Sequence, residues 1–200
     1  MKTKLLLLML VFGGLSSLPN LADDDKDKDD RDRGRPLRAT LSGSQEVPAL
    51  STPGEGEFEA RINEAGTAFD FKLKWEGLAG TTVTQSHIHF GQHGVNGGVM
   101  IWLCGSASNP GPAGTMVCPG PASGTVEGTV DASKVVGPSG QGIAATEFAK
   151  ALSAIRSGLA YANVHTNTFG GGEIRGQIRG RGRPFSVPAG LAREHSHGRD

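Results

Sequence analysis

A His-x-His pair is the feature of this sequence whose residue types and spacing favour a definite chemistry. His87 and His89 are separated by one residue, and because side chains alternate faces along a β-strand, both imidazoles project from the same side of an extended segment. His165 lies in a second strand-like run, residues 161–166. Imidazole is a common ligand of zinc and copper, so these histidines, with His93 from the following turn, form a candidate metal site.

The same histidines allow two interpretations. Three or four imidazoles on neighbouring strands would hold copper or zinc, whereas the alternative is a polar cluster in which the rings hydrogen-bond to backbone and carboxylate groups. A strand-borne His-x-His is also similar to that of copper/zinc superoxide dismutase, which leaves a copper-dependent redox enzyme as an alternative function. The chain has no recognisable zinc-binding loop with further His and Asp ligands, so we favour a binding module without catalysis.

Three further polar residues are candidates for the surroundings of the histidines. Asn163 shares a face with His165 in its strand, and Glu173 and Arg175 share a face in the run 173–179 if that run is also a strand. Pairing of the two strands predicts a polar network. Glu173 either orients a histidine ring, as carboxylates do for metal-bound imidazoles, or forms an ion pair with Arg175 that fixes the strand register.

The first residues of the chain are typical of an exported protein. Residues 1–22 combine two lysines, an apolar run and small residues, which predicts a signal peptide cleaved after Ala22 and a secreted or periplasmic protein. Export places Cys104 and Cys118 in an oxidising compartment, where we expect a disulfide. It would close a loop of about 15 residues. A Cys/His metal centre is the weaker alternative, because the chain has no C-x-x-C pair.

Two flanking segments lack the composition of a folded domain. Residues 23–36 contain seven aspartates among lysines and arginines, and residues 180–200 begin with Arg-Gly repeats, so both are expected to be disordered. The formal net charge of zero gives no reason to expect a nucleic-acid partner. Beyond the signal peptide no run is long and apolar enough to span a membrane. The expected partner is an unidentified extracellular ligand or envelope component.

Between the flanks, residues 37–179 are predicted to form one all-β domain. With 31 glycines and 6% aromatic residues, the composition favours short strands joined by tight turns over long helices. Apolar and charged residues alternate on both sides of a turn that contains Gly66, which predicts an antiparallel hairpin. Strands are predicted over 57–62, 69–75, 83–90, 98–103, 125–130, 160–166 and 173–179.

These strands predict an antiparallel β-sandwich, of the immunoglobulin-like or superoxide-dismutase-like kind, or a short barrel. One short helix is expected before the penultimate strand, because Phe148, Leu152, Ile155 and Leu159 recur at helical spacing. Thr146 is its candidate N-cap and Gly158 fits the stop position.

Several strings in this region together resemble the CHRD domain, a family named after the extracellular antagonist chordin and found also in bacterial exported proteins. The strings are ATLSGSQEVP (39–48), HIHFG (87–91) with GVNG (94–97), and YANVHT (161–166) with GGEIRGQI (171–178). The chain departs from the family pattern at Ala49, where a second proline is usual. The resemblance implies a β-rich extracellular module whose biochemical activity is largely undefined.

Overall fold

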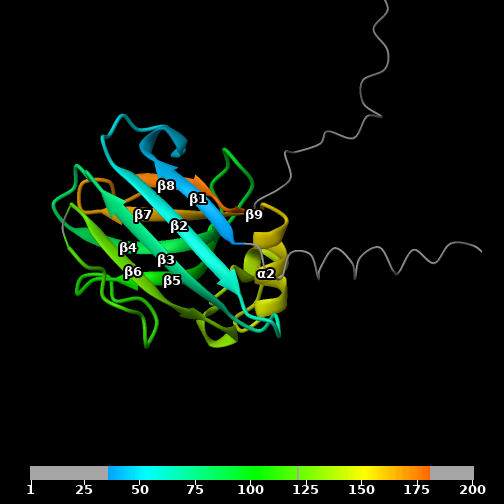
Figure 1. Ribbon diagram of the computed structural model, residues 1–200. Helices are drawn as coiled ribbons and strands as arrows, with labels where there is room; N and C mark the ends of the chain where they lie inside the picture. Colours follow the sequence, from blue (N-terminus) through cyan, green and yellow to red (C-terminus); the bar gives the residue numbers. More distant parts are fainter. Residues whose placement is uncertain (1–35, 121, 181–200) are drawn as a thin grey trace, which may run out of the picture.

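The computed structural model describes residues 36–120 and 122–180 (Figure 1). In this part of the chain, nine strands form one antiparallel sheet. The strands are β1 (Leu37–Ser42), β2 (Glu55–Ile62), β3 (Phe69–Glu76), β4 (Val83–Phe90), β5 (Gly98–Gly105), β6 (Gly124–Val130), β7 (Ala160–Thr166), β8 (Ile174–Gln177) and β9 (Arg179–Gly180). The predicted signal peptide, the charged linker up to residue 35 and the tail from residue 181 lie outside the described residues.

The sheet is continuous and curls into a nearly closed barrel. Its strand order is β5-β4-β7-β8-β1-β2-β3-β6, with β9 paired to β1. In Figure 1, β1, β2 and β3 cross in front of β4 and β5, so that one sheet supplies both sides of the core. The prediction of an all-β antiparallel fold is confirmed. Hydrogen bonds join all the described strands in one barrel-like sheet. An immunoglobulin-like or dismutase-like sandwich stays a prediction.

The hairpin of β2 and β3 forms as its alternation predicts. Phe58 of β2 pairs with Leu73 of β3 across the hairpin, and both side chains are buried in the core. The turn between the strands contains Gly66 at a φ of +67°, a conformation that glycine adopts without steric cost. The Asn63 side chain accepts hydrogen bonds from the backbone N–H groups of Thr67 and Ala68, which fixes the turn.

In residues 36–120 and 122–180 there is one α-helix, α2 (Phe148–Arg156), which lies at one end of the sheet (Figure 1). It ends as predicted, because Gly158 has a φ of +72° and its N–H donates to the Ile155 carbonyl. Its start is not as predicted. Thr146 has a φ of +69° and its N–H donates to the Val135 carbonyl, so the N-cap position falls on Glu147. The helix precedes β7, which is followed by two shorter strands, β8 and β9, and not by one.

Three short 3₁₀ helices complete the described elements: η1 (Gly43–Gln45), η2 (Ala132–Lys134) and η3 (Ser139–Gln141). The first follows β1 and leads to the loop that carries Glu46. The other two lie between β6 and α2. No helix in the described residues is long and apolar enough to span a membrane.

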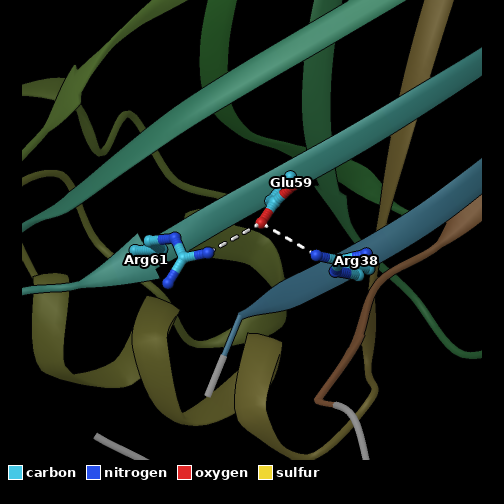
Figure 2. A network of polar contacts seen from close by, with 3 residues as sticks. All are labelled: Arg38, Glu59 and Arg61. Carbon is cyan, nitrogen blue, oxygen red and sulfur yellow. Dashed lines mark hydrogen bonds and ion pairs between the residues drawn. The ribbon is translucent and has the colours of Figure 1, made fainter. Parts of the chain in front are cut away.

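An exposed ion-pair network lies across β1 and β2. Figure 2 shows the Glu59 carboxylate between the guanidinium groups of Arg38 at 3.1 Å and Arg61 at 3.3 Å. All three side chains are at least 40% exposed. We expect Glu59→Gln to change the free energy of unfolding by less than about 0.5 kcal/mol, because water and salt screen exposed pairs. Urea denaturation measures this, and a loss of more than about 1 kcal/mol would contradict it.

Candidate metal centre

Strands β4 and β7 separate a hydrophobic face from a polar face. The two alanines and Val164 of β7 belong to the hydrophobic core, as does Ile88 of β4. Side chains alternate along a strand, so the neighbouring histidines of β4 and the polar residues of β7 project to the opposite face. Because every residue of β7 is buried, as are the residues of β4 from Ser86 to His89, this second face is also covered. The prediction that the His-x-His pair shares one face while Ile88 enters the core is confirmed.

The structure brings three of the four predicted ligands together. His87, His89 and His165 each offer a ring nitrogen, and these nitrogens all lie within 4.8 Å of one another. The side chains are 2%, 8% and 6% exposed. The closest approach is 3.3 Å, between Nδ1 of His87 and Nε2 of His165. β4 and β7 are paired, and this pairing is what places His165 beside the pair on β4.

Two of the rings are oriented by backbone carbonyls. Nδ1 of His89 lies 3.0 Å from the Gly97 carbonyl oxygen, and Nδ1 of His165 lies 3.0 Å from that of Gly170. A carbonyl only accepts hydrogen bonds, so each Nδ1 carries the proton and donates. Each Nε2 therefore presents a lone pair. This is the arrangement that holds metal-binding histidines in place, with the second ring nitrogen donating to a fixed acceptor.

Two buried imidazole nitrogens have no hydrogen-bond partner among the described residues: Nε2 of His87 and Nε2 of His89. A buried polar atom without a partner is unfavourable and calls for an explanation. Two nitrogens bound to one ion at about 2.0–2.1 Å lie about 3.3–3.6 Å apart, which matches the 3.3 Å between Nδ1 of His87 and Nε2 of His165. An ion held by these two atoms would bind His87 through Nδ1 and not through its Nε2. A side-chain adjustment of about 1 Å, the difference between 4.8 and 3.6 Å, brings all three into ligation distance.

Aromatic rings enclose the histidines. The Trp102 ring of β5 meets the His87 ring edge to face, with centroids 4.2 Å apart. The Tyr161 ring stacks on His89, with centroids 4.7 Å apart and planes 2° apart. On the neighbouring strand β8, the Arg175 guanidinium carbon lies 3.5 Å from the centroid of the Tyr161 ring, a cation–π contact. The three histidines thus lie in an environment of low polarity.

Burial keeps the three imidazoles neutral. Desolvation, followed by the neighbouring His165 and His89, lowers the pKa of His87 to about 2. Desolvation likewise lowers the pKa of His89 to about 4, and it also lowers the pKa of His165. A metal ligand must be the neutral imidazole. The folded domain therefore presents all three rings in the form that binds a metal.

Arg175 holds the loop that covers the histidines. Its guanidinium donates to the Val95 carbonyl at 2.7 Å, to the Gln92 carbonyl at 3.3 Å and to the Asn96 side chain at 3.1 Å. This loop also contains Gly97, whose carbonyl orients His89. Arg175 is therefore a positioning residue for the candidate site.

The other two members of the predicted polar network, Asn163 and Glu173, have different hydrogen-bond partners. Asn163 pairs with Arg175 in the strand register, and its side-chain amide donates to the Glu46 carboxylate at 2.6 Å. Glu173 does neither of the things predicted for it. Its carboxylate accepts hydrogen bonds from the hydroxyls of Thr52 and Thr166 and from two backbone N–H groups, and it contacts neither a histidine nor Arg175 among the described hydrogen bonds and ion pairs. The reason is that β8 begins at Ile174, so strand alternation does not extend to Glu173.

His93 is the predicted ligand that the structure sets apart. It is exposed in the loop between β4 and β5, and it lines a surface hollow with Arg38, Gln45 and Arg179. The group of histidines whose ring nitrogens converge does not include it. The structure therefore does not place the predicted fourth imidazole with the other three, and the loop after the pair directs the Gly97 carbonyl to the site.

One aromatic neighbour of the site, Trp102, and one acidic neighbour, Glu46, were not predicted. Trp102 pairs with His87 in the register of β4 and β5, and this contact depends on strand pairing, which alternation within one strand does not reveal. Glu46 lies in the loop after η1 and reaches Asn163 over a long sequence separation. The string ATLSGSQEVP (39–48) contains Glu46 and is one of the strings that carry the family resemblance. It was the sequence signal that could have indicated Glu46 as a neighbour of the site.

The predicted disulfide is present, between Cys104 and Cys118. It closes the loop that covers Trp102: a side chain at Gly111 would come within 2.6 Å of the indole ring, so the loop backbone approaches Trp102 closely. Trp102 in turn contacts His87. The disulfide therefore supports one wall of the candidate site.

Comparison with known families shows to which family this chain belongs. The model of the CHRD domain matches residues 37–178, more than half of the chain. The chain belongs to the CHRD family. No curated protein and no solved structure matches it. The matched part of this CHRD domain runs from the first residue of β1 to the residue after β8, and it includes the three convergent histidines and both cysteines.

The neutral histidines of the CHRD domain predict acid sensitivity. Below pH 6.5 the unfolded chain binds protons that the folded histidines reject, so the free energy of unfolding falls as the pH falls from 6.5 towards 4. The slope is about 1.4 kcal/mol per pH unit for each histidine. Glu46 acts in the opposite sense, because burial raises its pKa to about 7 and its contribution to stability therefore increases as the pH falls from 7 to 4.5.

His87 and His89 together outweigh Glu46, so the net free energy of unfolding should decrease on acidification between pH 6.5 and 4.5. Urea denaturation of the metal-free protein at several pH values measures it. His93→Ala should leave the profile unchanged, because this histidine lies apart from the buried group. A free energy of unfolding that stays constant or rises over that pH range would contradict the account of the buried histidines.

Proposed function

We propose that this CHRD domain is a secreted or periplasmic binding module that holds one transition-metal ion, copper or zinc, through His87, His89 and His165. The observation that carries the proposal is the convergence of three buried imidazoles, whose ring nitrogens lie within 4.8 Å of one another, with Nε2 of His89 left without a partner while its Nδ1 is fixed by a carbonyl. A polar cluster formed for stability alone would be expected to satisfy this atom. A bound ion satisfies Nε2 of His89 and uses the rings in their neutral form.

Binding is better supported than catalysis. An enzyme of the dismutase kind needs an open position at the metal for its substrate. Here the rings are at most 8% exposed and have Trp102 and Tyr161 against them. The surface hollow that His93 lines does not include any of the three convergent histidines. A closed site of this kind favours a module that retains an ion while the rest of the surface contacts an extracellular ligand or envelope component.

Metal analysis of the untagged chain tests the proposal. The full-length protein is saturated separately with copper and zinc, desalted, and analysed for metal by mass spectrometry. We expect one ion per chain in the wild type and in His93→Ala, and none in His89→Ala or His165→Ala. Because the tail contains His195 and His197, a His195→Ala/His197→Ala variant checks that the ion is not held there. Unchanged metal content in His89→Ala would overturn the proposal, as would a wild type without metal.

A further inference from the structure

We infer that the three-histidine site selects monovalent copper, Cu(I), over divalent zinc. This inference rests on the proposed function and names the ion that the same site takes. Three properties of the described site support it: a neutral set of ligands, a cation close to one ligand, and the convergence of three buried side chains.

The ligand set carries no negative charge. In the described residues, the group that converges consists of His87, His89 and His165 and contains no carboxylate and no thiolate. A bound divalent ion would thus keep its full charge of two in a buried place, and Cu(I) a charge of one. The cost of moving an ion from water into a medium of low dielectric constant grows as the square of its charge. Neutral, buried ligands therefore penalise the divalent ion more.

Arg175 adds a fixed positive charge beside the site. Its guanidinium lies on the Tyr161 ring, which itself stacks on His89. The repulsion between Arg175 and a bound ion is twice as strong for a divalent as for a monovalent ion at the same position. Glu46 offsets part of this charge, but its carboxyl is largely buried, and burial raises its pKa to about 7, so it is a weak counter-charge at neutral pH.

Coordination number points to the same ion. Zinc sites are almost always four-coordinate, and the fourth position takes a further side chain or a water. Here three side chains converge, with the Trp102 ring against His87 and the Tyr161 ring against His89. Cu(I), with a filled d shell and a single charge, is satisfied by three nitrogen ligands in a plane. A buried group of three imidazoles fits that coordination number.

Paired competition experiments on the untagged full-length chain test this selectivity. Cu(I) is generated without oxygen by ascorbate, which leaves the disulfide oxidised, and is titrated against a chromogenic Cu(I) chelator. Zn²⁺ is titrated against a fluorescent zinc indicator. We expect one Cu(I) per chain, bound about 100-fold or more tightly than Zn²⁺. Binding should be lost in His89→Ala and retained in His93→Ala and in His195→Ala/His197→Ala.

Substitution of Arg175 tests the electrostatic argument separately. Arg175→Gln removes the charge, so it should raise the affinity for Zn²⁺ by about the square of the factor by which it raises that for Cu(I), and selectivity should decrease. Arg175→Lys keeps the charge while it loses the planar fork that holds the loop, so it should favour Cu(I) over Zn²⁺ more strongly than Arg175→Gln does. Near-ultraviolet circular dichroism checks that both variants fold.

The outcomes separate this inference from the proposed function. Zinc bound at the histidines as tightly as Cu(I) would overturn the inference and leave the metal module standing. An Arg175→Gln variant with the wild-type ratio would also count against the inference. Failure of both ions to bind at the histidines would overturn the proposed function itself.

Discussion

Copper or zinc should raise the free energy of unfolding of the wild-type chain, and His89→Ala should abolish that increase. An ion that binds the folded state stabilises it by about 4 kcal/mol when its free concentration is 1,000 times the dissociation constant. The effect requires the ligands to converge, as His87, His89 and His165 do in the folded domain. Loss of one nitrogen leaves two, which hold an ion far more weakly. Urea denaturation with and without metal measures the difference.

A second variant at position 89 distinguishes the loss of the ring nitrogen from a change in packing. His89→Phe keeps a ring that can stack on Tyr161 but has no ring nitrogen, so it should fold and show no stabilisation by metal. His93→Ala is the matched control, because it removes an exposed histidine of the neighbouring loop, and it should keep the full effect. Stabilisation that survives in both His89 variants would place the ion elsewhere on the chain.

Replacing Glu173 by alanine should lower the free energy of unfolding by about 3–5 kcal/mol, because it would leave several buried donors without an acceptor. Glu173 is 0% exposed and accepts from the hydroxyls of Thr52 and Thr166 at 2.8 Å. It also accepts from the backbone N–H groups of Ala79 at 2.6 Å and Gly80 at 3.1 Å. These partners come from three separate loops and strands, which one carboxylate joins.

Glu173→Gln keeps the volume of the side chain but replaces one accepting oxygen by a donating amide group, so it should also be destabilising, though less than alanine. The exposed Glu59→Gln is the control for the loss of a negative charge. Urea denaturation near pH 7 measures all three variants. A loss below about 1 kcal/mol in Glu173→Ala would show that the carboxylate does not join these segments as described.

Properties within one strand could be predicted from the sequence. The alternation around Ile88 correctly directs this residue to the core and the two flanking histidines to the opposite face. Gly66 correctly marks the turn of the hairpin, and the two cysteines correctly indicate a disulfide. In each case the information is local, or the number of cysteines leaves one possible pair.

Properties that depend on where a strand begins, or on which strands pair, could not be predicted in the same way. Glu173 and Arg175 are two residues apart, yet the strand starts between them, so their side chains serve different parts of the domain. His93 is near the pair in sequence, but the loop turns it to solvent. The contact of Trp102 with His87 arises only from the pairing of β4 with β5.

Crystallography with anomalous scattering gives the most direct test that the three histidines bind one ion. Crystals of the untagged chain are grown with copper, and data are collected on both sides of the copper absorption edge. The account predicts one strong anomalous peak about 2.0–2.1 Å from a ring nitrogen of each of His87, His89 and His165. A peak at His93, or the lack of any peak among those three rings in copper-loaded crystals, would contradict it.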